Sequence, residues 1–315
     1  MVKVLITERF SLNALQRLKG QPGLDVQVVS SVQELHKLDL SAYEILVIRS
    51  KTKITSKFLQ SAKSLKFVVT STSGFDHIDL EASAANGVKV CYTPDANAQS
   101  AAELTWALLL ACVRKINKAQ QAVKSGNWNR EVLIGKELAG KTLGIIGLGR
   151  VGKRVARIAR AFDMNILAHD PYINEEDFKA ANAQRCGWEE VLRGCDVLTL
   201  HVPLTRETRH FINAPTLECV NDGVILINTS RGQVVNEQEV MRELREGRVW
   251  AMGLDVFESE PLPKDSALLE LDNVILTPHI GATTDEAFER ASQAAVDKVI
   301  AFREGKKVCD LLTHN

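Results

Sequence analysis

The chain has 315 residues, 45% of them hydrophobic and 25% charged, which is the balance of a soluble globular protein and enough length for two domains. Lys plus Arg equals Asp plus Glu at 39 each, so the formal net charge is zero and we expect no nucleic-acid partner. No apolar run approaches the roughly 18 residues of a membrane helix, and the start MVKVLITERF lacks the apolar region of a signal peptide. The six cysteines are scattered, without a C-x-x-C pair or a Cys/His cluster, which predicts reduced thiols, no metal site and a cytoplasmic protein.

Short β-branched runs alternate with amphipathic segments over the first 94 residues. Runs of this length, bounded by turn or charged residues, predict strands, and the segments between them predict helices. The predicted strands cover 2–7, 25–30, 44–50, 65–71 and 87–93, and the predicted helices cover 11–20 and 56–64. This β-α-β rhythm is typical of a parallel sheet.

A long helical segment without internal Gly or Pro follows at 97–126, and the strands resume after it. A second long amphipathic segment at 283–306 is suited to return the chain to the first domain. Between the two helices, six apolar runs separated by helical material predict a second doubly wound domain; they cover 142–148, 165–170, 197–202, 223–229, 250–256 and 273–279. We therefore predict an α/β protein with two doubly wound parallel sheets.

The stretch TLGIIGLGRVGKRVARIA, residues 142–159, contains the spacing G-x-G-x-x-G at Gly147, Gly149 and Gly152. The glycines follow an apolar strand and open an amphipathic helix, which is the setting that a dinucleotide-binding Rossmann turn requires. The first glycine makes the turn, the second lets the backbone approach a pyrophosphate, and the third lets helix and strand pack closely. Asp170 ends the next predicted strand, 18 residues beyond the last glycine, where an acid accepts from a ribose 2′-OH and repels a 2′-phosphate. We therefore predict NAD rather than NADP as the cofactor.

Further motifs extend over the chain: SGFDHIDL, NAQSAAELT, LHVPLTRETRHFI, LINTSRGQVVNE, GLDVFESEPLP and NVILTPHIGATT. Together with the glycine motif, they make essentially the whole chain resemble the D-isomer-specific 2-hydroxyacid dehydrogenase family. The resemblance implies a Rossmann-type NAD domain at 98–284, inserted in a flavodoxin-like substrate domain formed by 1–97 and 285–315.

Reduction of a 2-keto acid needs a cation for the carboxylate, an acid for the developing alkoxide and a partner that tunes this acid. Arg231 follows a predicted strand and can bind a carboxylate bidentately. His279 follows another strand at the same edge, and histidine exchanges protons near neutral pH. Glu260 can bond the far imidazole nitrogen and raise the histidine pKa; Glu258 is its nearest rival, and the family pattern favours Glu260. The resemblance places the catalytic Arg, Glu and His at these positions. We expect His201 to line the cofactor cleft, and we predict structural roles for His77, His169 and His210.

The resemblance also implies residues that bind cofactor and substrate. Asp255 would bind the nicotinamide carboxamide, although a turn cap is an equally open interpretation from sequence alone. Ser73 and Gly74 would offer backbone N–H groups to the substrate carboxylate, with a plain turn as the alternative. The predicted cofactor-binding residues are Gly147, Gly149, Arg150, Val151, Gly152, Asp170, Thr229, Ser230, Asp255 and Gly281.

Two branches of the family compete for the substrate. The segment IRSKTKIT resembles phosphoglycerate dehydrogenases, which act in serine biosynthesis and in which the arginine, here Arg49, lies near the substrate phosphate; Lys51 and Lys53 would add positive charge. Thr70 instead stands where that branch often has a basic residue, and His77 where Asn is common, as in glyoxylate and hydroxypyruvate reductases. D-3-phosphoglycerate is the favoured substrate. We expect no C-terminal regulatory domain in a chain of this length.

A non-enzymatic alternative stays open, because the family includes NAD-binding transcriptional corepressors. Those proteins use the fold as an interaction module and usually carry appended tails. The intact Arg, Glu and His favour an enzyme. The resemblance further implies a homodimer, and the helix AELTWALLLACVRKI is apolar beyond one face, so part of it is a candidate subunit contact.

Overall fold

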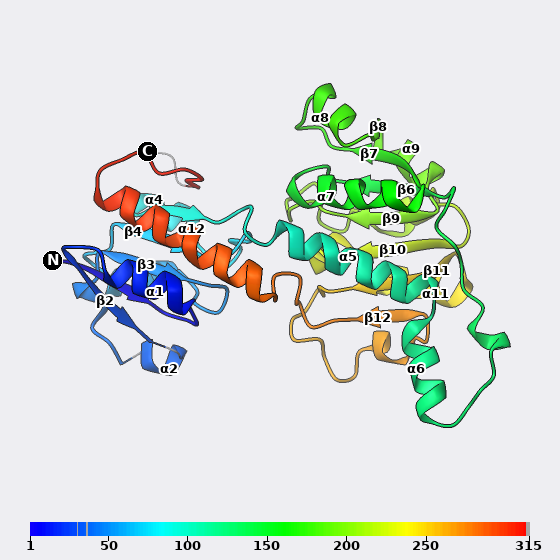
Figure 1. Ribbon diagram of the computed structural model, residues 1–315, viewed down its shortest axis with the longest axis horizontal. Coiled ribbons are helices and arrows are strands. Elements are labelled where there is room, and N and C mark those ends of the chain that lie inside the picture. The colour runs from blue at the N-terminus through cyan, green and yellow to red at the C-terminus, as the bar shows by residue number, and fades with distance from the viewer. Residues whose placement is uncertain (30, 36, 313–315) are drawn as a thin grey trace. The chain divides into compact units, whose positions relative to one another are not determined.

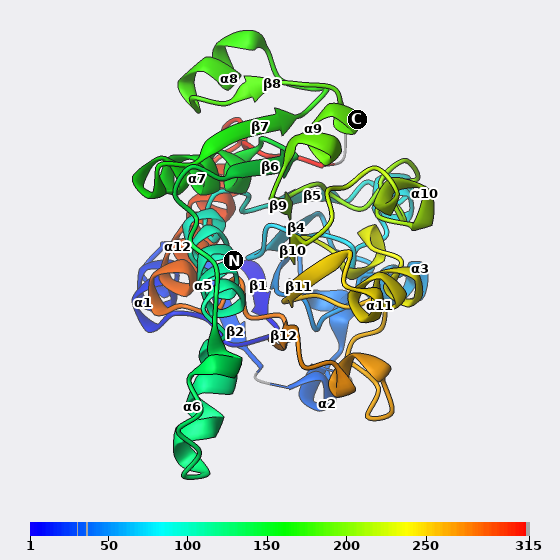
Figure 2. The ribbon, with the colours of Figure 1, turned by 90° about the vertical axis from the view of Figure 1, so that its right-hand side faces the viewer.

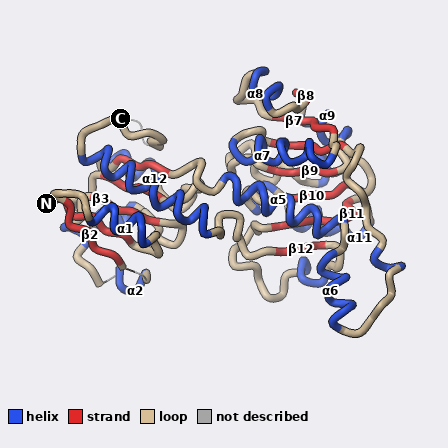
Figure 3. Tube along the Cα trace, viewed as in Figure 1, coloured by secondary structure: helices blue, strands red, loops and turns tan. Residues whose placement is uncertain are grey.

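The computed structural model describes residues 1–29, 31–35 and 37–312, and it divides into two compact units. Unit 1 consists of Met1–Ala98 and Ala282–Asn315, and unit 2 of Gln99–Gly281, so each boundary lies within three residues of the predicted one. Strands and helices alternate along both units (Figure 3). Ser30, the last residue of a predicted strand, and 313–315, the end of the predicted substrate domain, lie outside the described residues.

Unit 1 contains a five-stranded parallel sheet in the order β2-β1-β3-β4-β5. Figure 1 labels its strands β2, β3 and β4. This order is that of flavodoxin-like folds, as predicted. The strands are β1 (Val2–Ile6), β2 (Leu24–Val28), β3 (Ile45–Ile48), β4 (Phe67–Thr70) and β5 (Lys89–Tyr92). The helices are α1 (Leu12–Lys19), α2 (Val32–Leu35), α3 (Ser56–Ser61), α4 (Leu80–Ala85) and α12 (Asp285–Arg303).

Helices cover both faces of this sheet, and its inner strands β3 and β4 are buried at every residue, which explains their apolar sequences. One face packs against α1 and α12, through side chains such as Leu18 and Val299. The other face packs against α2, α3 and α4, through side chains such as Leu35 and Leu59. Four of the helices begin at a polar residue whose side chain accepts a backbone N–H of the first turn: Ser11, Thr55, Asp79 and Thr284.

Unit 2 contains a seven-stranded parallel sheet in the order β12-β11-β10-β9-β6-β7-β8. Successive strands run outward from β6 in one direction and then from β9 in the other, which is the Rossmann arrangement extended by one strand, as predicted. The strands are β6 (Thr142–Ile146), β7 (Asn165–His169), β8 (Gln184–Arg185), β9 (Val197–Leu200), β10 (Val224–Asn228), β11 (Val249–Leu254) and β12 (Val274–Leu276). The helices are α5 (Ala98–Val113), α6 (Ile116–Lys124), α7 (Arg150–Ala159), α8 (Glu175–Ala180), α9 (Trp188–Gly194), α10 (Ala214–Leu217) and α11 (Glu237–Glu246).

Two hydrophobic cores enclose this second sheet. Helices α5 and α7 pack on one face, and α9, α10 and α11 on the other. Trp106 of α5 stacks on Phe162, with ring centroids 4.7 Å apart, and donates its indole N–H to the carbonyl of Val155. The strands are therefore held from both sides, and their ends are fixed for the side chains that follow them.

The prediction of one long helix at 97–126 is wrong in one respect, because the structure has two helices there, α5 and α6. Lys115 lies between the two with φ of 51°, in the left-handed region. The apolar side chains of α5 pack largely into the core of unit 2 rather than remaining free for a subunit contact. Among the described residues, no helix is both long enough and apolar enough to cross a membrane.

Candidate active site

The candidate site residues of unit 2 follow the carboxyl ends of its strands. Parallel strands end at one edge of the sheet, and ligands of open α/β sheets bind outside that edge. There the chain places Gly147 after β6, Asp170 after β7, Arg231 after β10, Asp255 and Glu260 after β11, and His279 after β12.

Each glycine of the G-x-G-x-x-G motif meets a different steric requirement. Gly147 has φ of 93°, and a Cβ there would lie 2.8 Å from the carbonyl group of His201. A Cβ on Gly152 would lie 2.2 Å from the carbonyl oxygen of Gly147, so helix and strand touch at this point. A Cβ on Gly149 would meet no described atom within 4 Å, which leaves its backbone open to a ligand. This geometry fits a dinucleotide pyrophosphate at the N-terminus of α7.

Asp170 lies against the same glycine loop. Its Oδ2 accepts the backbone N–H of Leu148 at 2.9 Å, and its Oδ1 accepts the N–H of Tyr172 at 3.0 Å. Arg150 and Val151 form the first turn of α7, directly after Gly149. The predicted pyrophosphate and ribose contacts are thus neighbours in space.

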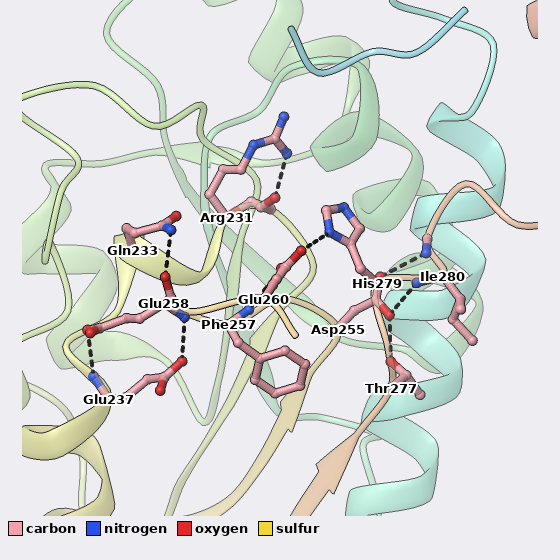
Figure 4. A network of polar contacts seen from close by, with 12 residues as sticks. Arg231, Gln233, Glu237, Asp255, Phe257, Glu258, Glu260, Thr277, His279 and Ile280 are labelled. Carbon is pink, nitrogen blue, oxygen red and sulfur yellow. Dashed lines mark hydrogen bonds and ion pairs between the residues drawn. The ribbon is translucent and has the colours of Figure 1, made fainter. Parts of the chain in front are cut away.

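Glu260 and His279 are joined by a hydrogen bond (Figure 4). Nδ1 of His279 donates to Oε2 of Glu260 at 2.7 Å, while Oε1 of Glu260 accepts the N–H of Phe257 at 3.1 Å. This bond raises the pKa of His279 against the effect of its burial, and the charges of Glu260 and Asp255 raise it further. Burial alone would raise the pKa of Glu260, but His279, the Phe257 N–H and the charge of Arg231 together lower it. The pair therefore favours an imidazolium beside a carboxylate.

Glu258, the rival of Glu260, binds other groups. Its Oε1 accepts the N–H of Glu237 at 3.1 Å and lies 3.1 Å from Nε2 of His210. No contact joins it to His279 among the described residues. Glu260, two residues after Glu258, is thus the carboxylate that forms the hydrogen bond with His279.

Arg231 lies on a loop organised by a buried residue that the sequence interpretation missed. Asn228, the last residue of β10, is fully buried; its Oδ1 accepts the N–H and hydroxyl of Ser230 at 3.0 and 2.8 Å. Its Nδ2 donates to the carbonyl oxygen of Arg231 at 2.9 Å. Thr229 is tied to α5 by a 2.8 Å bond between its hydroxyl and that of Thr105. An Asn just before Thr-Ser at a strand end is a turn signal, and it was available in the sequence.

Asp255 holds the loop that carries His279. Its Oδ1 accepts from the Thr277 hydroxyl at 2.6 Å and from the N–H of Ile280 at 2.8 Å, and its Oδ2 accepts from the N–H of Gly281 at 2.8 Å. His279 itself has φ of 53°, which is uncommon for a residue other than glycine. The turn-cap interpretation of Asp255 therefore describes its contacts within the chain.

His201 follows β9 beside the glycine loop. Its Nε2 is buried and has no hydrogen-bond partner in the part of the chain that the structure describes. Burial lowers the pKa of His201 to about 3. The ring is therefore neutral at physiological pH and does not serve as a proton donor there.

Unit 1 has a cavity of about 450 Å³ at the carboxyl ends of β1 and β3. The guanidinium carbons of Arg9 and Arg49 lie 4.8 and 5.1 Å from the ring centroid of Phe288. Three cationic side chains and two carboxylates line the cavity, together with the N-terminus of α12; the residues are Glu8, Arg9, Arg49, Lys51, Ala282, Thr283, Thr284, Asp285 and Phe288. The balance of charge and the helix N-terminus favour an anion.

Arg49 has an unsatisfied group at this cavity. Its Nη1 is buried without a hydrogen-bond partner among the described residues, and burial lowers the pKa of Arg49 although Glu8 opposes this. The Oε1 atom of Glu8 accepts the backbone N–H groups of Arg49 and Thr52 at 3.1 and 2.9 Å, so that oxygen is already engaged. A bound anion would supply the missing acceptor. Lys53 is exposed and does not line the cavity.

Ser73 and Gly74 follow β4 in unit 1. The Ser73 hydroxyl donates to Oδ1 of Asn97, and no acceptor for the backbone N–H of Ser73 or Gly74 is found within the described residues. These amides are therefore available to a ligand. Nearby, Nε2 of His77 lies 3.1 Å from the Thr70 hydroxyl, which supports a structural role for this histidine.

Residues 106–281 match the model of the D-isomer specific 2-hydroxyacid dehydrogenase family, NAD binding domain. The chain belongs to this family. The predicted fold class and the NAD cofactor are thereby confirmed.

Proteins similar to this chain carry different names. A "D-3-phosphoglycerate dehydrogenase" of Archaeoglobus fulgidus is 39% identical over 98% of this chain and 58% of its own length. A "Hydroxypyruvate reductase" of Thermotoga maritima is 41% identical over 94% of this chain and 97% of its own length. A solved D-lactate dehydrogenase of Aquifex aeolicus, complexed with NAD and lactic acid, is 34% identical, with a TM-score of 0.83 and 96% of each chain covered. The chain spans 57% or 58% of the length of the phosphoglycerate dehydrogenases it matches.

Proposed function

We propose that this protein interconverts a 2-keto acid and the corresponding D-2-hydroxy acid by hydride transfer with NAD(H). The Glu260–His279 hydrogen bond, with Arg231 close enough to influence both pKa values, is the observation that carries the proposal. NADH supplies the hydride when it is bound at the glycine loop.

The roles of the three side chains follow from their chemistry. Arg231 binds the substrate carboxylate and polarises the neighbouring carbonyl group. The imidazolium of His279 gives its Nε2 proton to the alkoxide oxygen as it forms, and Glu260 stabilises the imidazolium that is needed for this step. Asp170, Gly149 and the first turn of α7 bind the cofactor. In the reverse direction, neutral His279 accepts the hydroxyl proton.

The pH dependence of the two directions tests these roles. Because Glu260 raises the pKa of His279 above its ordinary value of about 6.5, reduction should persist at neutral pH and decline as pH rises through the His279 pKa. Oxidation should rise over the same range. Glu260→Gln removes the charge, so the decline of reduction should move to lower pH, and the shift should be modest because both side chains are partly exposed. Identical pH profiles of kcat/KM for the two proteins would contradict the pairing.

We further propose 3-phosphohydroxypyruvate and D-3-phosphoglycerate as the substrate pair, a reaction of serine biosynthesis. The cationic cavity of unit 1 supports this choice, because the buried Nη1 of Arg49 lacks the acceptor that a phosphate would provide. Ser73 and Gly74 would bind the carboxylate through their amides. Hydroxypyruvate or glyoxylate reduction is the alternative; Thr70, His77 and the similarity to the Thermotoga maritima reductase favour it.

A panel of keto acids separates the two substrates. We expect kcat/KM for NADH oxidation to be higher with 3-phosphohydroxypyruvate than with hydroxypyruvate, glyoxylate or pyruvate. Arg49→Ala should lower the value for the phosphorylated substrate about 10- to 100-fold and affect hydroxypyruvate little. Lys53→Ala, on the same loop but outside the cavity, is the matched control. If hydroxypyruvate is the better substrate of the unmodified enzyme, the reductase alternative is correct.

A homodimer is a further proposal, supported by exposed apolar side chains. Helix α6 extends beyond the β12 edge of its sheet (Figures 1 and 2). The segment 116–134 exposes Ile116, Val123, Trp128, Val132 and Ile134, with Trp128 75% and Ile134 72% exposed. Clustered exposed apolar side chains favour a protein–protein contact, and a second copy of the chain would bury these. The six free cysteines support a cytoplasmic location.

A further inference from the structure

The loop that carries Glu260 is held against α11 by contacts to which the proposed chemistry assigns no role. The backbone N–H of Glu258 donates to Oε1 of Glu237 at 2.7 Å, and the backbone N–H of Glu237 donates to Oε1 of Glu258 at 3.1 Å. Nε2 of Gln233 donates to the carbonyl oxygen of Glu258 at 2.9 Å. Figure 4 shows the three bonds together beside the Glu260–His279 pair. We call Glu237, Glu258 and Gln233 the clamp.

We propose that the clamp positions Glu260 for its bond to His279, which makes Glu237 and Glu258 positioning residues of the reaction. The proposal rests on the acid–base roles proposed above. The connection is short, because Phe257 directly precedes Glu258 in the chain. The N–H of Phe257 donates to Oε1 of Glu260 at 3.1 Å, and Oε2 of the same carboxylate accepts from His279 at 2.7 Å. Fixing the backbone at Glu258 therefore fixes the donor that orients the Glu260 carboxylate.

The clamp also joins the loop of Arg231 to the loop of Glu260. A Cβ on Gly232, which follows Arg231, would lie 2.0 Å from the carbonyl oxygen of Phe257 and 2.5 Å from the N of Glu258. The two backbones are therefore in direct contact, and no larger residue fits. Gln233 is the next residue and adds its bond to the same place. One set of contacts thus sets the positions of the substrate-binding arginine and of the carboxylate that tunes the histidine.

Carboxylates suit the positions of Glu237 and Glu258 in the clamp. Glu237 is the first residue of α11, after the N-cap Asn236, so its N–H has no acceptor within the helix and Glu258 supplies one. Both carboxylates lie at the positive end of the helix dipole, and hydrogen bonds to charged acceptors are about twice as strong as neutral ones. Burial raises the pKa of Glu237, and the negative charge of Glu258 adds to this effect. The hydrogen bond from the Glu258 N–H acts in the opposite direction. Nε2 of His210 lies 3.1 Å from Oε1 of Glu258.

A purely structural role would predict a different result from a positioning role. Besides its burial, the charged groups that act on the pKa of His279 within the described part of the chain are Glu260, Asp255 and Arg231. We therefore expect a change at Glu258 or Glu237 to reach His279 through Glu260. A structural defect lowers Tm and the fraction of active enzyme but leaves the pH at which reduction declines unchanged. A misplaced Glu260 weakens the bond to His279 and moves that decline to lower pH.

The experiment measures pH profiles of kcat/KM for keto-acid reduction, together with the pH titration of His279 by NMR in the same protein. For Glu258→Ala and Glu237→Ala we expect the apparent pKa to fall toward about 6.5, a roughly three- to tenfold lower kcat at neutral pH, and an unchanged KM for NADH. Glu237→Gln keeps an acceptor oxygen and should restore most of the profile. If the alanine variants do not fold, Gln233→Ala removes a single bond of the clamp and should shift the profile in the same direction.

Two comparisons make the outcome decisive. Glu243→Gln changes a carboxylate on the same helix, bonded to Arg248 at 3.0 Å and away from the catalytic loop, and should leave the profile unchanged. Glu260→Gln reports on the proposed function itself. If Glu260→Gln shifts the profile and none of the clamp variants does, the clamp is only structural and the inference is wrong. If Glu260→Gln also leaves the profile unchanged, the acid–base proposal fails and the inference fails with it.

Discussion

Alanine at Gly152 should lower stability, whereas alanine at Gly149 should impair cofactor binding. Gly152→Ala would place a Cβ 2.2 Å from the carbonyl oxygen of Gly147, whereas real Cβ atoms essentially never approach within 3.0 Å, so backbone must move by about 1 Å. Gly147 cannot yield easily, because its N–H is bonded to the carbonyl of His169 at 2.8 Å. Overpacking of this kind costs about 1–3 kcal/mol. At about 2–4 °C per kcal/mol for a domain of this size, Tm should fall by several degrees.

Gly149→Ala should leave stability unchanged and impair cofactor binding. Its φ of −77° lies outside the left-handed region, and no described atom lies within 4 Å of the added methyl group. We expect the free energy of unfolding to stay within about 0.5 kcal/mol of the unmodified value. The methyl group would occupy the space proposed for the pyrophosphate, so Kd for NADH should rise at least about tenfold, or about 1.4 kcal/mol.

Thermal melts with and without NADH separate the two defects. A ligand at about 100 times its Kd stabilises a protein by about 2.7 kcal/mol, so the unmodified protein and Gly152→Ala should gain Tm on addition of NADH. Gly149→Ala should melt normally alone and gain little. Normal NADH binding by Gly149→Ala, or a normal melt of Gly152→Ala without cofactor, would refute the assignment of the two glycines.

Three further results are expected. Arg231→Lys should lower kcat/KM for reduction about 100-fold, because an ammonium group cannot bind a carboxylate bidentately. Arg245→Lys, in the last turn of α11, is the control. Near-native turnover of Arg231→Lys would exclude the bidentate role. The enzyme should prefer NADH to NADPH in kcat/KM by at least about tenfold, and Asp170→Ala should reduce that preference; equal efficiency of the two cofactors in the unmodified enzyme would contradict the role of Asp170. Light scattering at micromolar concentration should show a dimer that Ile134→Asp dissociates, and a monomeric unmodified protein would count against the proposed interface.

The strands were predictable from sequence because both sheets are covered on both faces. A parallel strand buried in this way has a largely apolar sequence, and each predicted strand corresponds to an observed one, although the edge strand β2 is mostly exposed. The exception is β8, whose two residues, Gln184 and Arg185, are exposed at the edge of the second sheet. A strand defined only by its pairing with β7 leaves no hydrophobic signal in the sequence.

The break between α5 and α6 could not be predicted from local sequence, because a distant segment causes it. The carbonyl oxygen of Val113 accepts the N–H of Lys136 at 2.9 Å. Gly135 packs so closely on that carbonyl that a Cβ would lie 2.3 Å from it. The helix therefore ends where a residue more than 20 positions away takes its carbonyl, and Lys115 enters the left-handed region without the Gly or Asn that would announce it.

The candidate site was predictable to the extent that its residues carry chemistry. Arg231, Glu260 and His279 follow strand ends within recognisable motifs, whereas Glu258 and Glu237 resemble ordinary surface acids. What distinguishes them is a reciprocal pair of bonds between residues 21 positions apart, and no local pattern encodes such a pair. Side chains that act on the substrate can be found from residue type, but those that orient them are found only from their partners.

Asp255 shows why two interpretations of one residue need not compete. A carboxylate has about four lone-pair positions, and the contacts of Asp255 use two on Oδ1, for Thr277 and Ile280, and one on Oδ2, for Gly281. If Asp255 binds the nicotinamide amide, the role that the family resemblance implies, it would use the remaining position on Oδ2. The same carboxylate holds the His279 backbone at φ of 53°, a conformation that costs about 1–2 kcal/mol outside glycine. Cofactor binding and placement of the catalytic histidine would then depend on one buried side chain, so occupancy of the nicotinamide site and the orientation of His279 should be coupled.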